Sequence, residues 1–289
     1  MKIIAEVPGS CGELLQGTVA GKPLLVTCPI DQYSRAILEV GPPMKLPPKA
    51  QKMARLASEF YGVPLDSLRI TLQSDLPRSK GMSSSSADMA AVASVIAYYG
   101  KREIDPREIL ALCLKVEPTD GTFFPGIVGM DHLAGTFVES LGTSPQIEIQ
   151  IFDLGGEVDT GWFNQRKELA LLNRQKEPAV IAAWKELKVG FSLGDSAKIA
   201  EGATQSARAH QSILFKSGLD ELMDRLSFYG ALGIVTAHSG TVIGVLWEDY
   251  DEKAWRDLQI FAAELIPDLT FLTRAKLIQG GIRVWEEIE

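Results

Sequence analysis

The residues that most suggest chemistry lie in a serine-rich loop, PRSKGMSSSSADMA, at positions 77–90. A glycine-bearing loop that opens a helix presents unpaired backbone N–H groups, and these groups together with the helix dipole favour an anion. Serine can cap such a helix, and its hydroxyl can also contact a phosphate oxygen or a metal ion. Arg78 and Lys80 add positive charge to the loop. The loop is therefore a candidate phosphate cradle.

Other interpretations of the serine loop compete with the cradle. The helix expected after it, ADMAAVASVIAYY, is apolar around most of its circumference and should be buried, which disfavours a flexible linker. Nucleophile motifs such as G-x-S-x-G and S-x-x-K are absent, as are the Walker A and G-x-G-x-x-G phosphate motifs. An ordinary N-capped core helix explains the loop as well as a cradle does. On these residues alone both interpretations stay open.

The elements that would position this loop follow from hydrophobic periodicity and turn signals. Strands come in adjacent pairs rather than alternating with helices, so the pattern predicts an α+β protein of two sheet-and-helix layers, not a doubly wound sheet. The junction between its two parts is expected near residues 155–162. The expected strands are 2–7, 24–28, 34–40, 68–74, 135–141, 146–153, 231–237, 241–247, 269–273 and 282–287. The expected helices are 48–61, 84–98, 105–116, 163–173, 178–189, 194–213, 218–229 and 251–265, with a loop over 117–135.

Composition bounds the class of protein. The 289 residues suit one large or two associated domains, and the net charge of −8 argues against a nucleic-acid or anionic-membrane partner. Cys11, Cys28 and Cys113 are odd in number and lack C-x-x-C spacing, which favours a reducing compartment over disulfides or structural zinc. Cys11 is expected to be a small packed residue rather than a reactive thiol. With no signal peptide and no membrane-length apolar run, a cytoplasmic protein is expected.

Three stretches, in order along the chain, resemble the motifs of the GHMP kinases, which include galactokinase, homoserine kinase and mevalonate kinase. Residues 77–87 resemble P-x-x-x-G-L-G-S-S-A-A, with Ser83 and Ser86 where the family usually has glycine and alanine. PGSCGELLQG at 8–17 resembles the N-terminal motif, and AHSGTVIGVL at 237–246 resembles the C-terminal glycine-containing motif. The resemblance covers essentially the whole chain and turns the cradle into the favoured interpretation.

Within that family, the chain is most similar to the L-threonine kinases of cobalamin synthesis. The shared motifs are P-x-S-C-G-E-L-x-Q-G, a following C-P-x-D, G-M-x-S-S-x-A-D and the stretch EPTDGTFFPGIVGMDH at 117–132. The resemblance implies an N-terminal ATP-binding domain over 1–158 with a ribosomal-protein-S5-like fold, and a ferredoxin-like domain over 159–289. It implies transfer of the γ-phosphoryl group of ATP, with Mg²⁺, to the hydroxyl of L-threonine. Homoserine kinase or another GHMP kinase is one alternative, and a non-catalytic nucleotide- or metabolite-binding protein is another.

Roles for the phosphate side of the site are carried over from the family. The cradle comprises Pro77, Lys80, Gly81, Met82 and Ser83, Ser84, Ser85 and Ser86. Ser85 and Glu117 stand at the metal-binding positions. A negative charge at the C-terminus of a helix interacts unfavourably with the helix dipole, which suggests that Glu117 is present for a reason other than helix stability. Asp131 is the first choice for a catalytic base, with Asp120 as its competitor. Homoserine kinases work without such a base, so the resemblance leaves open whether either is needed.

Roles for the acceptor side follow from the segments expected to line the site. Glu13 and Asp31 could meet an ammonium group, although Asp31 serves equally well as a polar cap at a strand end. Arg78 or Arg35 could meet a carboxylate. The remaining substrate-binding candidates are Ser10, His238, Ser239 and Gly240. The expected partners are L-threonine, or a similar hydroxy amino acid, and ATP; a homodimer is left open.

Overall fold

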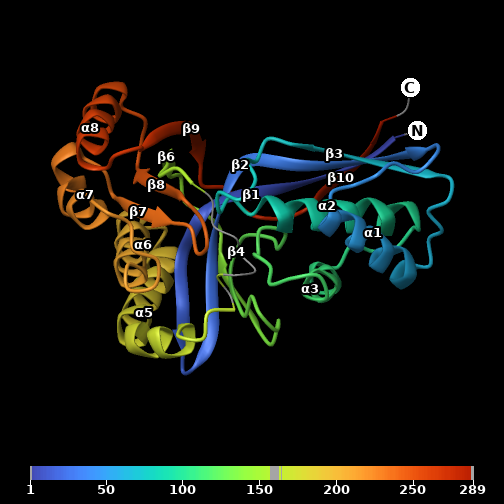
Figure 1. Cartoon of the computed structure of the whole chain (residues 1–289), viewed down its shortest axis with the longest axis horizontal. Helices are drawn as coiled ribbons and strands as arrows, with labels where there is room; N and C mark the ends of the chain where they lie inside the picture. Colours follow the sequence, from blue (N-terminus) through green and yellow to red (C-terminus); the bar gives the residue numbers. More distant parts are fainter. Residues whose placement is uncertain (1, 157–162, 164, 288–289) are drawn as a thin grey trace.

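The computed structural model describes residues 2–156, 163 and 165–287. The central element of the fold is a long antiparallel hairpin formed by β1 (Lys2–Val19) and β2 (Lys22–Val40). This hairpin runs through the molecule between its two halves (Figure 1). The two-residue turn has φ of 52° at Ala20 and 70° at Gly21, the paired positive values of a type I′ hairpin.

The expectation of separate strands at 2–7, 24–28 and 34–40 is wrong, because β1 continues through its three glycines and β2 runs without a break from Lys22 to Val40. The register of β1 against β2 shifts between Pro8 and Ser10, between Ser10 and Glu13, and between Glu13 and Leu15. Such bulges bend a strand and re-aim its side chains without ending the pairing. The first GHMP-like motif is therefore a distorted stretch of strand rather than a loop.

The first half of the chain contributes three helices, of which the second packs directly on this hairpin and the other two pack on that helix. Strands β3 (Leu68–Ser74) and β4 (Ile127–Met130) pair with β2, while β5 (Val138–Gly142) pairs with β4 and β10 (Arg283–Glu287) with β1. Figure 1 shows α1 (Pro48–Tyr61), α2 (Ser84–Tyr99) and α3 (Pro106–Leu114) on one side of these strands. Every residue from Ser86 to Ala97 of α2 is buried, which confirms the predicted buried helix.

The second half has the β-α-β-β-α-β plan of ferredoxin-like domains. Its strands are β6 (Glu148–Asp153), β7 (Gly233–Thr236), β8 (Val242–Trp247) and β9 (Thr270–Lys276), in the antiparallel order β7-β8-β6-β9. Its helices are α5 (Leu169–Leu193), α6 (Ser196–His210), α7 (Leu219–Arg225), a 3₁₀ turn at Leu226–Tyr229, and α8 (Glu252–Leu265). The α+β class and the ferredoxin-like second half are confirmed.

Pairing also shows how the halves meet. Glu13 of β1 pairs with Thr236 of β7, so the described strands form one continuous path rather than two separate sheets. Strand β6 pairs with β8 and β9, which places it with the second half although it precedes residue 159. The predicted domain boundary after residue 158 lies outside the described residues and stays a prediction.

Two further expectations are wrong for local reasons. Helix α5 continues through Pro178, where two helices were expected, because its buried face, from Lys176 to Phe191, packs on α6 and β1. The four residues of β4 lie in the segment expected to be loop, and they form a strand because Leu25 and Val26 of β2 pair with them. In the part of the chain that is described, no helix has the length and apolar character needed to cross a membrane.

Candidate active site

The three GHMP-like stretches meet at one point of the fold. The backbone N–H of Ser10 donates to the carbonyl of Met82 at 3.1 Å. The N–H groups of Thr241 and Val242 both donate to the carbonyl of Lys80, at 3.0 and 3.1 Å. Segments about 70 and 160 residues apart in sequence are therefore fixed to the serine loop by backbone hydrogen bonds.

Glycine is required where the serine loop touches the third stretch. Gly81 has φ of +85°, and a Cβ there would lie 2.3 Å from the Cβ of Ala237. A Cβ on Gly240 would lie 2.4 Å from the carbonyl oxygen of Lys80. Close approach of the two backbones explains both glycines.

The contact encloses a cavity of about 190 Å³ at the N-terminal end of α2. Both halves of the chain contribute to its walls, which carry carboxylates, hydroxyls and imidazoles. The lining residues are Glu13, Lys49, Ser79, Gly81, Met82, Ser83, Ser84, Ser85, Ser86, Glu117, Pro118, Thr119, Asp120, His132, His238 and Ser239.

The first turn of α2 has no side-chain cap. Ser83 occupies the N-cap position with φ of 55°, in the left-handed region that favours glycine, and this is the position where GHMP kinases usually have glycine. Its hydroxyl lies 2.5 Å from that of Ser10 and makes no capping hydrogen bond, so the expected serine cap is wrong. The N–H groups of the first turn are thereby left for another partner.

A serine, a carboxylate and a lysine form a chain beside this helix end. The hydroxyl of Ser85 donates to Oε1 of Glu117, and Nζ of Lys49 lies 2.5 Å from Oε2. Glu117 follows α3 and Lys49 lies in the first turn of α1. The structure thus brings the two predicted metal ligands together. Lys49 was missed from the sequence, where it is one of several lysines near prolines.

Two more carboxylates face the cavity from β1 and from the segment after α3. Asp120 accepts from Ser86 Oγ at 3.3 Å, and its own N–H donates to Ser86 Oγ at 3.1 Å. Burial raises the pKa of Asp120, and its hydroxyl partners oppose that shift only in part. Glu13 is 4% exposed, its Oε2 is buried without a hydrogen-bond partner, and burial with nearby Asp120 raises its pKa well above the usual range.

Asp131 does not line the cavity. Its carboxylate accepts hydrogen bonds from the N–H groups of Leu133 and Ala134, both at 3.0 Å, and from the hydroxyl of Thr136 at 2.8 Å. Burial alone would raise the pKa of Asp131, but these hydrogen bonds outweigh it and lower the pKa. The carboxylate is committed to its own turn, and Asp120 is the aspartate that the structure brings to the cavity.

Other predicted residues also lie outside the lining set. Nζ of Lys80 is 2.7 Å from Oδ2 of Asp153 and donates to the carbonyl of Gly156, so it does not face the serines. Asp31 is exposed and accepts from the N–H of Lys276 at 2.8 Å. Pro77 and Gly240 shape the loops that bound the cavity without lining it, and Ser10 reaches it through Ser83. Cys11 is fully buried, which raises the pKa of its thiol and fits a packed residue.

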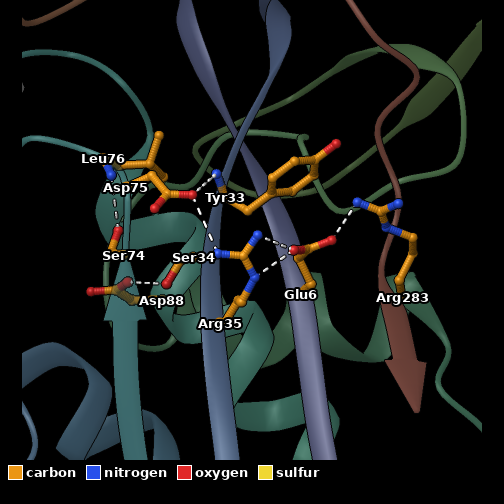
Figure 2. Close-up of polar contacts among 9 residues, drawn as sticks. All are labelled: Glu6, Tyr33, Ser34, Arg35, Ser74, Asp75, Leu76, Asp88 and Arg283. Atoms are coloured by element: carbon orange, nitrogen blue, oxygen red, sulfur yellow. Dashed lines mark hydrogen bonds and ion pairs between the residues drawn. The ribbon is translucent and has the colours of Figure 1, made fainter.

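Arg35, a candidate for binding a substrate carboxylate, belongs to a different network (Figure 2). Its Nε lies 2.6 Å from Oε2 of Glu6, and its Nη1 lies 3.3 Å from Oδ2 of Asp75. Arg283 of β10 binds the other oxygen of Glu6. This network joins β1, β2 and β10 to the segment after β3, and Arg35 does not line the cavity.

Two histidines line the cavity, with ring centroids 5.2 Å apart. His132 is 7% exposed, and burial lowers its pKa to about 4. Burial and the neighbouring positive charges also lower the pKa of His238 well below its usual value. Both imidazoles are therefore neutral at physiological pH.

Comparison with known proteins shows which family the chain resembles. Residues 49–131 match the family model described as GHMP kinases N terminal domain. The L-threonine kinase of Citrobacter freundii is 30% identical over 97% of this chain and 99% of its own. That of Salmonella typhimurium is 30% identical over 84% of this chain and 82% of its own, whereas a homoserine kinase of Staphylococcus haemolyticus matches only 27% of this chain and 26% of its own, at 28% identity.

Solved structures show the same fold. The homoserine kinase of Cytophaga hutchinsonii superimposes with a TM-score of 0.70 over 98% of this chain and 97% of its own, at 17% identity. Three motifs joined around one cavity, the family match and the full-length relative agree, so the chain belongs to the GHMP kinase family and is an ATP-dependent kinase acting on a hydroxyl group.

Proposed function

We propose that this kinase phosphorylates the side-chain hydroxyl of L-threonine, giving O-phospho-L-threonine. The observation that carries the proposal is that one cavity holds the open N-terminus of α2 with Ser85 and Glu117, and also the acidic pair of buried Glu13 and half-buried Asp120. The first group suits phosphates and a divalent cation, and the second suits an ammonium and a hydroxyl. The two L-threonine kinase relatives, matched over 99% and 82% of their own lengths, support the same substrate.

The residues at the phosphate end fit ATP with Mg²⁺. Mg²⁺ prefers oxygen ligands and keeps several waters, so the hydroxyl of Ser85 and the carboxylate of Glu117, already in contact, form a sufficient protein set. When bound, Mg²⁺ would neutralise charge that develops on the transferred phosphoryl group. The N–H groups of α2 would hold phosphate oxygens, and Lys49 balances the charge of Glu117.

The acceptor end suits a hydroxy amino acid. Glu13 presents a buried carboxylate oxygen that has no hydrogen-bond partner within the described residues, and an ammonium group is the ligand that would satisfy it. Asp120 is the carboxylate that we propose to accept the hydroxyl proton, because burial raises its pKa and makes it a stronger base than an ordinary aspartate. Its hydrogen bonds with Ser86 hold it at the edge of the phosphate cradle.

Two finer expectations belong to this proposal. Cobalamin synthesis would consume the O-phospho-L-threonine, and the odd number of buried, unpaired cysteines suits a reducing cytoplasm. The cavity residues named above all come from one chain, so the proposal does not depend on the homodimer.

A substrate panel tests the proposal. With ATP, Mg²⁺ and the full chain, ADP release should be faster with L-threonine than with homoserine, L-serine, mevalonate or galactose. A preference for homoserine would overturn the threonine assignment and leave the kinase family intact.

Variants test phosphoryl transfer against simple binding. We expect Ser85→Ala and Glu117→Gln to lower kcat by roughly a hundredfold or more, since each removes a group that stabilises transferred charge. Ser192→Ala and Glu264→Gln, on exposed positions of α5 and α8, are matched controls. If the wild-type chain binds ATP but shows no turnover with any hydroxy compound, the alternative of a non-catalytic binding protein is correct.

A further inference from the structure

The ring of His238 is held in one tautomer by a buried glutamine. Nδ1 of His238 lies 3.0 Å from Oε1 of Gln16, a fully buried residue of β1. The amide nitrogen of Gln16 donates to the carbonyl oxygen and to the hydroxyl of Thr236, at 3.2 Å each. The amide is therefore oriented with its oxygen, which can only accept, toward the ring. Nδ1 of His238 must carry the hydrogen, and Nε2 bears the lone pair.

A second series of hydrogen bonds fixes the backbones of Gln16 and His238. Nε2 of His210 lies 3.0 Å from the carbonyl of His238, so it donates, and Nδ1 of His210 then accepts from Nζ of Lys176 at 3.1 Å. Nζ of Lys176 also donates to the carbonyl of Gln16 at 3.0 Å. Lys176 is 6% exposed and His210 is 1% exposed. Two helices of the second half thus hold Gln16 and His238 together.

His238 lines the active-site cavity. The ring lines that cavity beside His132, and within the described part of the chain its Nε2 has no hydrogen-bond partner. His132, His210, Lys176 and Lys216 are the titratable groups around it. Burial lowers the pKa of His238, and the positive charge of Lys176 and Lys216 lowers it further. A neutral ring with a lone pair on Nε2 accepts hydrogen bonds and cannot donate one from that atom.

We propose that Gln16 is a positioning residue that fixes His238 as the Nδ1–H tautomer, so that Nε2 accepts a hydrogen bond from the ammonium group of the acceptor substrate. This inference rests on the proposed function, and it makes His238 a specificity residue. An amino acid supplies a donor for Nε2 and also one for the buried Oε2 of Glu13, which has no hydrogen-bond partner among the described residues. A hydroxy acid without the amino group leaves both unsatisfied, which disfavours its binding.

The tautomer can be measured without any activity. The chain has three histidines, so the ¹⁵N spectrum of its imidazoles has three sets of signals, and His238 is assigned by their loss in His238→Asn. We expect a protonated Nδ1 and an unprotonated Nε2 at His238 in the wild-type chain. Gln16→Met should admit the other tautomer, and Gln16→Glu, which still accepts from Nδ1, should keep the first. A wild-type ring protonated at Nε2, or one that Gln16→Met does not change, overturns the inference.

Kinetics test the substrate contact. We expect His238→Asn and Gln16→Met to raise KM for L-threonine roughly tenfold and to leave KM for ATP within about twofold. His238→Gln, which can place an amide oxygen near the Nε2 position, should recover part of the loss. Binding of 3-hydroxybutyrate, measured as competitive inhibition, should change little in any of these variants because it has no ammonium group.

A matched control and the two modes of failure complete the design. Gln205→Met makes the same change on α6 away from His238 and should leave KM unchanged. If L-threonine is not a substrate of the wild-type chain, the proposed function fails, while the tautomer is still decided by the ¹⁵N spectrum. If L-threonine is a substrate but His238→Asn weakens L-threonine and 3-hydroxybutyrate equally, the ammonium contact is wrong.

Discussion

At the scale of single residues, identical side chains acquire different chemistry from their partners. Asp120 is half-buried at the cavity with two hydroxyl partners, and desolvation raises its pKa. Asp131 accepts several hydrogen bonds from its own turn, and its pKa is lowered. A carboxylate whose charge is stabilised in this way is a weak base, which makes Asp120 the better candidate for the hydroxyl proton.

The two aspartates predict opposite phenotypes. We expect Asp120→Asn to lower kcat by roughly a hundredfold or more with little loss of stability. Asp131→Asn should lower the free energy of unfolding by about 1–3 kcal/mol through weaker charge-assisted hydrogen bonds, with kcat less affected. Steady-state kinetics and denaturant unfolding of both variants check this. Equal loss of kcat in the two variants would contradict the assignment.

The pH profile gives a second check on Asp120. Because its pKa is raised, activity should fall with decreasing pH already above the usual aspartate range, as the base becomes protonated. That acid limb should disappear in Asp120→Asn, measured as residual kcat against pH. An unchanged acid limb would mean that another group, such as Glu13, controls it.

At the scale of elements, the serine loop depends on its contact with the segment before β8. Gly81 has both a positive φ and a neighbour that leaves no room for a side chain, whereas Gly142 has φ of +95° and open space around its Cβ position. The two glycines therefore separate backbone strain from steric exclusion.

We expect Gly142→Ala to cost about 1 kcal/mol of unfolding free energy, from the left-handed backbone alone. Gly81→Ala should cost about 1–3 kcal/mol more, because its Cβ would overlap that of Ala237. Denaturant unfolding of the two variants measures the difference. Equal costs would show that the loop moves away from Ala237 without penalty.

The elements also show which features could be predicted from sequence. Helix α2 was predicted within one residue at its C-terminus, because a continuous apolar run after a glycine-bearing loop has one physical solution, a buried helix. For the β1–β2 hairpin, the sequence pattern predicts three short strands instead of two long ones. The bulged residues resemble loop residues in sequence, and only the pairing across the hairpin shows that the strands continue through them. Local preference likewise favours a break at Pro178, and only the packing of α5 on α6 and β1 overrides it.

At the scale of the whole molecule, a buried lysine of the second half makes a hydrogen bond to the central hairpin. Lys176 of α5 reaches the backbone of β1, and burial lowers its pKa to about 7. The unfolded chain keeps an ordinary lysine, so above about pH 7 the unfolded state binds more protons than the folded state at this position. Stability contributed by this group therefore rises with pH.

We expect the difference in unfolding free energy between the wild-type chain and Lys176→Met to grow by up to about 1.4 kcal/mol per pH unit between about pH 7 and pH 8.5. Comparison with Lys185→Met on the same helix, at an exposed position, controls for the loss of a lysine. Denaturant unfolding at several pH values gives the slope. A difference that stays constant with pH would mean that Lys176 keeps an ordinary pKa in the folded protein.

The sequence by itself determined the family, the α+β class, the buried helix and the pairing of Ser85 with Glu117 as candidate metal ligands, because short motifs and hydrophobic periodicity are local properties. Only the tertiary structure decided which side chains share the cavity. It brought Asp120 rather than Asp131 to the serines, turned Lys80 toward Asp153, and added Lys49. It also joined Gln16, Lys176 and His210 around His238, residues up to 222 positions apart. Hydrogen-bond partners and burial depend on such long-range packing, and no local pattern encodes them.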